Sequence, residues 1–381
     1  MNKKKLFLIH NHKNFSGAAR SLGETIISLE KKVNFIVICP KGSSSKFFKS
    51  LGIEVIEVMF IPRFNHFEIG FYKGLRWLMI IREIIALIYF FFFLIFLKIK
   101  HNKIEKFHLN ELELSIVAPI LKLFFDANIT SHLRCPLETK KGKFRYSFLS
   151  YICKNFLNKI IAIDYDCYKT SPIKKKTSIV YNGINNKNLI FKKRKKNILT
   201  FGFIGNFIKR KGIYEVLEVF KEMKNYNIKL ICVGKSHQKN RLLNFLNFER
   251  NFDDYLNKNK ILNNKNIKIL PIMFDLKKFY SSIDIIIFPG FMNAVGRPVI
   301  EGSLLKKPSI IALKKHNFDT AKKNNCLIFK PGDLTSLKKK VLYFYKNKSK
   351  IKKMGYLAFK NAKKNFDINK NSKKLYKIIW N

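Results

Sequence analysis

Short apolar runs alternate with polar or amphipathic segments along this chain, and the same alternation restarts in the second half. The runs have the length of buried strands and the segments between them the length of helices, which predicts parallel sheets covered by helices on both faces. We expect an α/β protein with two Rossmann-like, doubly wound domains that face each other across a ligand cleft at the carboxyl ends of their strands. The predicted strands are Leu6–His10, Phe35–Cys39, Glu54–Val58, Lys106–Leu109, Ile129–Leu133 and Lys159–Ile163, then Ile198–Ile204, Lys229–Val233, Ile267–Leu270, Ile283–Phe288, Ser309–Ala312 and Leu327–Phe329.

A strongly basic stretch separates the two halves. It is Lys192–Lys196, which follows the turn dipeptide Asn182-Gly183. With 381 residues the chain has the length of two domains of ordinary size. We therefore predict a first domain over residues 1–190, a second over 191–365, and a final helix over 366–381 that crosses back to the first domain.

The stretch Phe288–Pro308 carries the clearest signal for a ligand. An apolar strand breaks at a Pro-Gly pair, and the chain then passes through Gly296 into a helix with Glu301 in its first turns. A helix start attracts a diphosphate, and a carboxylate further along can accept hydrogen bonds from ribose hydroxyls. An ordinary strand-to-helix connection has the same pattern. The nucleotide interpretation predicts a diphosphate cradle made by the backbone N–H groups of Val295, Gly296 and Arg297.

The segment Leu75–Leu97 is the most apolar of the chain, and charge is absent from Ile84–Leu97. This uncharged run is shorter than the ~20 residues of a membrane-spanning helix. Phe90–Phe93 put apolar side chains all round the helix, which is more than one buried face needs. We therefore predict a helix that packs on the sheet and also enters the membrane surface. A purely buried helix and a transmembrane helix are the alternatives.

The charge balance indicates anionic partners. Lysine and arginine number 75 against 25 acidic residues, a formal net charge of +50. The lysines are spread along the chain, and no RNA- or DNA-reading motif accompanies them, so we expect no nucleic-acid partner. An anionic membrane surface and phosphorylated substrates fit the charge. The six cysteines form no CxxC pair, which indicates reduced thiols and a cytoplasmic protein.

Six motifs occur in the order found in one enzyme family, over nearly the whole chain. The motifs are SGAARSL (16–22), similar to GGAERSL; HLN (108–110) and SHLR (131–134), similar to HxN and HxR strand ends; IVYNGIN (179–185), similar to VxNGVD; FIGNFIKRKG (203–212), similar to vGRxxxxKG; and DIIIFPG…GRPVIEGSLLKKP, similar to DvxvxPS…FGxxxxEAmaxGxP. With these motifs the chain resembles the retaining glycosyltransferases of family 4 (glycosyl transferases group 1), of bacterial surface-polysaccharide type, and this resemblance implies the GT-B fold.

The resemblance assigns roles to residues of the second domain. Lys211 matches the lysine of the KG turn, whose charge stabilises the departing diphosphate. Asn206 stands where the family has an arginine, and the neighbouring Arg210 is a candidate replacement for that cation. Glu301 matches the second glutamate of the family's E-x7-E pair, which holds the ribose hydroxyls. Asn293 stands at the first glutamate, which contacts the donor sugar, and an amide there keeps hydrogen bonding but loses the negative charge.

In the first domain the resemblance singles out two strand-end or loop positions. Gly17 sits where the backbone is expected to turn tightly into a helix, and it should let the loop approach the diphosphate. His132 matches the family position near the reactive face of the donor sugar, and Arg134 ends the same strand. A lone strand-end histidine is as often a packed residue as a functional one.

The resemblance implies a transferase that moves a sugar from a nucleoside diphosphate sugar to a hydroxyl of a lipid-linked or surface-polysaccharide acceptor, with retention of configuration. The family's proposed chemistry is same-face attack, in which the leaving phosphate takes the acceptor proton, so we expect no metal and no cofactor. We expect the protein to lie at the inner face of the cytoplasmic membrane. The alternatives are a non-catalytic or weakly active nucleotide-sugar-binding relative, favoured by Asn293, and a GT-B-like nucleotide-sugar epimerase.

Overall fold

The chain forms two compact units in a computed structural model that describes residues 3–67, 78–139, 142–185, 198–235, 252–273, 275–291, 295–317 and 319–381. Unit 1 comprises Met1–Ile184 together with Phe366–Asn381, and unit 2 is Asn185–Asn365. The division between units thus falls at residues 184 and 185, whereas the sequence placed it at 190. The basic stretch Lys192–Lys196 lies outside the described residues.

Unit 1 is built on a seven-stranded parallel sheet with strand order β3-β2-β1-β4-β5-β6-β7. Its strands are β1 (Lys4–Ile9), β2 (Val33–Pro40), β3 (Glu54–Val58), β4 (Lys106–Leu109), β5 (Asn128–Leu133), β6 (Lys159–Ala162) and β7 (Thr177–Ile179). Its helices are α1 (Gly17–Leu29), α2 (Ser43–Ser50), α3 (Met79–Lys100), α4 (Ala118–Phe125), α5 (Lys143–Phe156), α6 (Tyr165–Thr170) and α14 (Ile368–Trp380), with 3-10 helices at Leu112–Val117 and Lys174–Lys176.

Helices cover both faces of this sheet, because successive residues of a strand point to opposite sides. Phe7 and Ile9 of β1 pack in one cluster with residues of α3, α4 and α5. Leu6 and Leu8 of the same strand pack in a second cluster with residues of α1, α2 and α14. The continuous apolar run that predicted a strand is therefore a strand buried on both faces.

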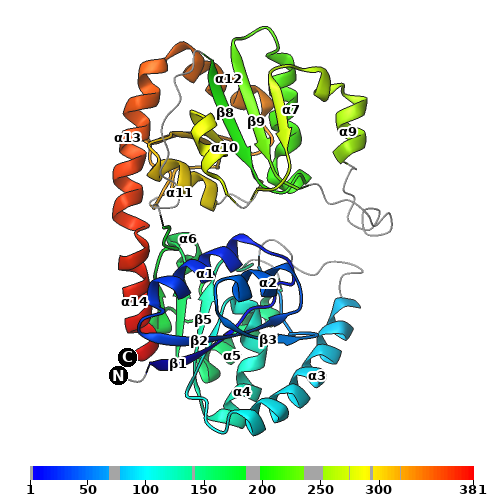
Figure 1. Cartoon of the computed structure of the whole chain (residues 1–381), viewed down its shortest axis with the longest axis vertical. Helices are drawn as coiled ribbons and strands as arrows, with labels where there is room; N and C mark the ends of the chain where they lie inside the picture. Colours follow the sequence, from blue (N-terminus) through cyan, green and yellow to red (C-terminus); the bar gives the residue numbers. More distant parts are fainter. Residues whose placement is uncertain are drawn as a thin grey trace. The chain divides into compact units, whose positions relative to one another are not determined.

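The last helix, α14, returns to unit 1 and packs beside α1 (Figure 1). Leu375 and Ile379 of α14 join the second cluster, and Nζ of Lys4 lies 4.9 Å from the centroid of the Trp380 ring. The chain re-enters the unit at the Asn-Gly motif. Here a Cβ on Gly183 would lie 2.5 Å from Cα of Ile368, so this close approach requires glycine.

Helix α3 buries only one stripe of its surface. Ala86, Phe90, Leu94 and Leu97 face the core at intervals of three or four residues. The opposite face carries large exposed apolar side chains at the same intervals, namely Ile81, Ile84, Ile85, Ile88, Phe92, Ile95, Phe96 and Ile99. In the described part of the chain, α3 is the helix that is long and apolar enough to cross a membrane, judged by length and composition alone.

Unit 2 has a six-stranded parallel sheet with strand order β10-β9-β8-β11-β12-β13. The strands are β8 (Leu199–Ile204), β9 (Ile228–Val233), β10 (Ile267–Leu270), β11 (Ile285–Phe288), β12 (Ser309–Ala312) and β13 (Cys326–Phe329). The helices are α7 (Ile213–Glu222), α9 (Phe252–Lys258), α10 (Lys277–Ser282), α11 (Arg297–Leu304), α12 (Leu334–Lys346) and α13 (Lys348–Asn365), with 3-10 helices at Lys209–Lys211 and Ile261–Asn263. Both sheets therefore match the predicted parallel, doubly wound architecture.

Candidate functional site

In unit 2 two predicted ligand-binding segments lie together at one sheet edge. Strands β8 and β11 pair in parallel, so the segments that follow them leave the sheet at the same edge. The amide of Phe291 donates a hydrogen bond of 3.0 Å to the carbonyl of Arg210. Gly212 has a φ of +74°, and a Cβ there would lie 2.3 Å from the carbonyl oxygen of Pro289. Only glycine allows this backbone approach, which joins the KG turn to the loop after β11.

The cations of the KG turn differ in exposure. Lys211 is half-buried at the end of the 3-10 helix Lys209–Lys211, whereas Arg210 and Asn206 are exposed. The backbone of Arg210 holds Phe291, while Asn206 lies in the loop directly after β8. Lys211 and Arg210 are thus both beside the loop that leads to α11, which is where the sequence predicted diphosphate binding.

Glu301 is enclosed within unit 2. Its side chain comes from the second turn of α11, and the residue is 1% exposed. Oε2 accepts a hydrogen bond of 2.6 Å from the hydroxyl of Tyr280 on α10, and Oε1 accepts one of 2.7 Å from Nε of Arg297. Each carboxylate oxygen can accept more than one hydrogen bond, so this geometry remains compatible with the predicted contact to ribose hydroxyls.

The diphosphate cradle is described in part. Gly296 is the N-cap of α11, Val295 precedes it, and Arg297 is the first helical residue. The first N–H groups of a helix lack partners within that helix, so the predicted donors are at a helix start. Asn293, the residue at the position of the first family glutamate, lies outside the described residues.

In unit 1, His132 belongs to a buried hydrogen-bond network at the carboxyl ends of β4 and β5. Nδ1 of His132 lies 2.6 Å from Nε2 of His108, whose Nδ1 lies 2.7 Å from Oγ1 of Thr130. Burial, with the charge of Arg134, lowers the pKa of His108 to about 3, and the same causes hold the pKa of His132 well below its usual value. His132 is therefore a neutral imidazole at physiological pH.

Arg134 ties three strand ends of unit 1 together. Its guanidinium donates to the backbone and side-chain oxygens of Asn110 after β4, and at 2.9 Å to Oδ1 of Asn182 after β7. His132, Arg134 and Asn182 also line a small pocket with Thr25 of α1 and residues of α14. The side chain of Arg134 thus has a structural role, and His132 reaches a pocket.

Gly17 is not at a tight turn. It is the first residue of α1, its φ is not positive, and a Cβ there would meet nothing within 4 Å. The turn is made instead by Ser16, whose Oγ caps the helix by accepting a hydrogen bond from the amide of Ala19. The expectation of a tight turn at Gly17 was therefore wrong, while the approach of this loop to a diphosphate stays a prediction.

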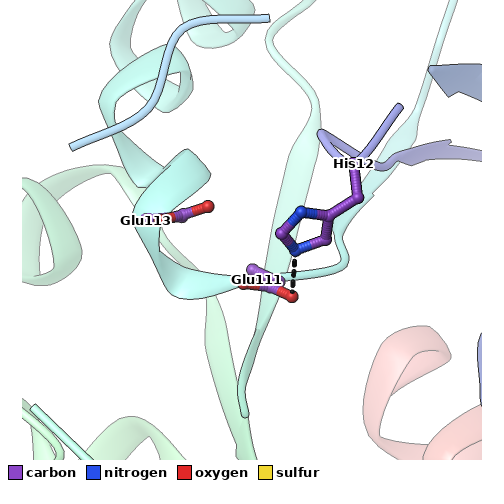
Figure 2. Close-up of side chains that lie close together, drawn as sticks. All are labelled: His12, Glu111 and Glu113. Atoms are coloured by element: carbon purple, nitrogen blue, oxygen red, sulfur yellow. Dashed lines mark hydrogen bonds and ion pairs between the residues drawn. The ribbon is translucent and has the colours of Figure 1, made fainter. Parts of the chain in front are cut away.

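A cluster of His12, Glu111 and Glu113 was not predicted from the sequence (Figure 2). His12 follows β1 and the two glutamates follow β4, and these neighbouring strands bring residues about a hundred positions apart to one edge. In the part of the chain that the structure describes, these three form the group whose spacing would suit a metal ion. Arg63 lies 3.8 Å from Glu113, however, and Asn11 donates a hydrogen bond to the same carboxylate. The carboxylate of Glu113 therefore already has a cation and an amide as partners.

The sequence also missed Tyr280, which holds the carboxylate of Glu301. The sequence shows it only as a tyrosine a few residues before an apolar strand, and such residues are usually part of a hydrophobic core. Asn110 and Asn182 lay within recognised motifs, but their shared partner Arg134 could be found only once the sheet order was known.

Residues 185–361, nearly the whole of unit 2, match the family model described as glycosyl transferases group 1. Unit 2 therefore carries a sequence match to the family that its motifs predicted. Over 182 residues the chain is 25% identical to the capsular polysaccharide biosynthesis glycosyltransferase CapM of Staphylococcus aureus. This match covers 47% of the chain and 43% of CapM, so it spans less than half the length of that relative.

Solved structures extend the likeness to both units. HepE of Anabaena, crystallised in complex with UDP-glucose, has a TM-score of 0.75 at 14% identity and is matched over 98% of each chain. A glycosyltransferase of Rickettsia africae has a TM-score of 0.74 at 17% identity, over 100% of this chain and 98% of its own. At these identities the likeness concerns the fold, and it confirms the predicted GT-B fold with two doubly wound domains.

Proposed function

We propose that the chain is a glycosyltransferase that uses a nucleoside diphosphate sugar. The observation that carries this proposal is the joining of the KG turn to Pro289 and Phe291, in the loop after β11, within the segment that matches glycosyl transferases group 1. Lys211 and the helix start bring positive charge and N–H donors to one place, which suits a leaving diphosphate. The buried carboxylate of Glu301 suits ribose hydroxyls.

The proposed reaction is transfer with retention to a hydroxyl of a lipid-linked or surface-polysaccharide acceptor. The acceptor oxygen bonds to the anomeric carbon while the bond from that carbon to the phosphate oxygen breaks. The electron pair leaves on the nucleoside diphosphate, whose phosphate takes the acceptor proton. This step balances without a metal or another cofactor, and the likeness to CapM supports the polysaccharide acceptor class.

The donor is tested with a panel of UDP-, GDP- and ADP-sugars. We expect one nucleotide class to raise the Tm of the purified chain, because a ligand that binds only the folded state stabilises it by mass action. With added bacterial membranes, the same donor should be consumed and its labelled sugar should appear in the lipid or polysaccharide fraction. No Tm shift and no consumption with any donor would refute the proposal.

The same assay separates the second candidate, a nucleotide-sugar-binding relative with little or no activity. This candidate is favoured by Asn293, which lacks the charge of the family glutamate. It predicts a Tm shift without sugar transfer. A nucleotide-sugar epimerase would instead convert the donor to a product of unchanged mass when no acceptor is present.

We further propose that unit 1 binds the surface of an anionic membrane through α3. The isoleucines and phenylalanines on the outer face of α3 lie opposite its buried stripe, and Phe92 is 64% exposed. Leu123 of α4 and Phe144 of α5, which pack on the same sheet face, are also exposed. Lys98 and Lys100 end the helix in a chain of net charge +50, which suits anionic headgroups.

The double change Ile88→Glu and Phe92→Glu is expected to lower the binding of the chain to phosphatidylglycerol vesicles by at least about tenfold. Each large apolar side chain contributes about 1.5–3 kcal/mol when it leaves water, and the two charges oppose insertion. Sedimentation with vesicles measures the effect, and circular dichroism checks the fold. The control is Ile27→Glu, an exposed isoleucine of α1 on the other sheet face. Equal sedimentation of the double variant and the control would contradict the proposal.

A further inference from the structure

We infer that His12, Glu111 and Glu113 form a binding site for sugar hydroxyl groups of the acceptor, in which His12 accepts a hydrogen bond from the hydroxyl. The inference rests on the proposed transferase function and adds a substrate contact in unit 1. Figure 2 shows the imidazole of His12 next to the two carboxylates, with its hydrogen bond to Glu111 dashed.

The first support is the geometry of the three side chains. Nε2 of His12 lies 2.9 Å from Oε1 of Glu111, so Glu111 fixes the orientation of the ring. Among the described residues, Nδ1 of His12 has no hydrogen-bond partner. One potential ligand atom from each of the three residues lies within 4.8 Å of the others, while no direct bond joins Glu113 to the imidazole. This spacing allows one hydroxyl oxygen to contact more than one of the groups.

The second support is a gradient of exposure. The side chain of His12 is 33% exposed, that of Glu111 is 10% exposed, and that of Glu113 is 3% exposed. A ligand therefore meets the imidazole first and the carboxylates behind it. The site lies at the carboxyl ends of β1 and β4, the edge at which parallel α/β sheets bind ligands.

The third support is an excess of hydrogen-bond acceptors. When Nε2 of His12 donates to Glu111, its Nδ1 is an acceptor, and the carboxylates add more acceptors. Oδ1 of Asn11, whose amide nitrogen donates to Glu113, is a buried acceptor without a partner. The ring of the fully buried His10 packs against that of His12, and its Nδ1 accepts from the amide of Asn110, so its unpartnered Nε2 is a donor that a hydroxyl oxygen can accept from. Such buried, unsatisfied atoms require an explanation. A ligand rich in O–H donors satisfies these acceptors, whereas a diphosphate, which is an acceptor, is repelled.

Titration of the groups around His12 gives the site a pH dependence. Burial opposes a charged imidazole, but the hydrogen bond and charge of Glu111, with the charge of Glu113, outweigh burial and Arg63 and raise the pKa of His12 above its usual value. Burial and repulsion by Glu111 raise the pKa of Glu113 to about 7, against the charges of Arg63 and His12. A protonated imidazole has no acceptor, so sugar binding should increase as pH rises through the pKa of His12.

The test measures sugar binding and donor use separately. In NMR spectra of the full chain, methyl β-D-glucopyranoside is expected to shift the ring signals of His12, which are assigned by their loss in His12→Gln. Glu111→Gln should weaken this response about tenfold and move the pH midpoint of His12 to lower pH, because it removes the partner that raises the pKa. His101→Gln, a substitution elsewhere in unit 1, should leave both unchanged.

Nucleotide binding distinguishes this inference from the proposed function. With bacterial membranes as the source of acceptor, His12→Gln should transfer the sugar at least about tenfold more slowly, while its affinity for the free nucleotide stays within about twofold of the wild type. A wild-type chain that binds no nucleotide would refute the proposed function but would leave the NMR test of the site in force. No His12 shift with the glucoside, or an equal loss of nucleotide binding in His12→Gln, would overturn the inferred site.

Discussion

Replacing Lys211 by alanine is expected to lower turnover of the nucleotide sugar about 100-fold, the usual cost of removing one fixed donor from a developing negative charge. Lys211 is half-buried beside Gly212, whose backbone packs against Pro289 of the loop before α11. The fold thus fixes the position of the Lys211 charge before the reaction begins. Turnover under saturating donor measures this effect, because a contact made mainly in the transition state lowers kcat more than it weakens binding.

Two neighbouring lysine and arginine residues provide the matched comparisons. Lys209 is an exposed lysine of the same 3-10 helix, and Lys209→Ala should retain turnover within about twofold. Arg210→Ala tests whether the guanidinium of Arg210 replaces the family arginine, whose position is occupied by Asn206. If Lys211→Ala and Lys209→Ala consume donor equally fast, Lys211 does not stabilise the leaving group.

Replacing Glu301 by alanine is expected to lower the free energy of unfolding by about 3 kcal/mol and to abolish detectable nucleotide binding. The change removes a carboxylate that is 1% exposed and accepts hydrogen bonds from Tyr280 and Arg297. It leaves a cavity and takes the balancing charge away from Arg297. Thermal unfolding should show the loss as a decrease of about 6–12 °C in Tm.

Smaller changes separate the structural role of Glu301 from its ligand role. Glu301→Gln keeps the side-chain volume and should unfold closer to the wild type, yet it should still weaken nucleotide binding because a neutral amide is a weaker acceptor for ribose hydroxyls. Tyr280→Phe removes only the hydroxyl that holds Oε2, and it should weaken binding less than Glu301→Gln does. Wild-type nucleotide affinity in Glu301→Gln would contradict the assignment to ribose.

Local pattern was enough to predict the elements that carry the proposed donor site. The break at Pro289, the helix that begins at Arg297, and the placement of Glu301 one turn later all follow from short-range signals. The KG turn at Gly212 was also recognised from the sequence. Its positive φ requires only that this one residue lacks a Cβ.

Contacts across the sheet were beyond prediction from the sequence. His12 meets Glu111 because β1 pairs with β4, and the sequence does not specify that these strands are neighbours. A histidine after one strand and a glutamate after another are each ordinary surface residues until the sheet order is known. Tyr280 was missed for a related reason, since its hydroxyl finds Glu301 across two helices.

The return of α14 has a consequence for the order in which the protein is made. Leu375 and Ile379 complete a core that also contains Leu22 and Ile26 of α1. A ribosome therefore releases the whole of unit 2, a continuous segment that can close its own core, before unit 1 receives its last helix. Unit 1 thus begins to emerge before unit 2 but is completed after it, and deletion of α14 would damage a domain whose other elements lie far from it in the sequence.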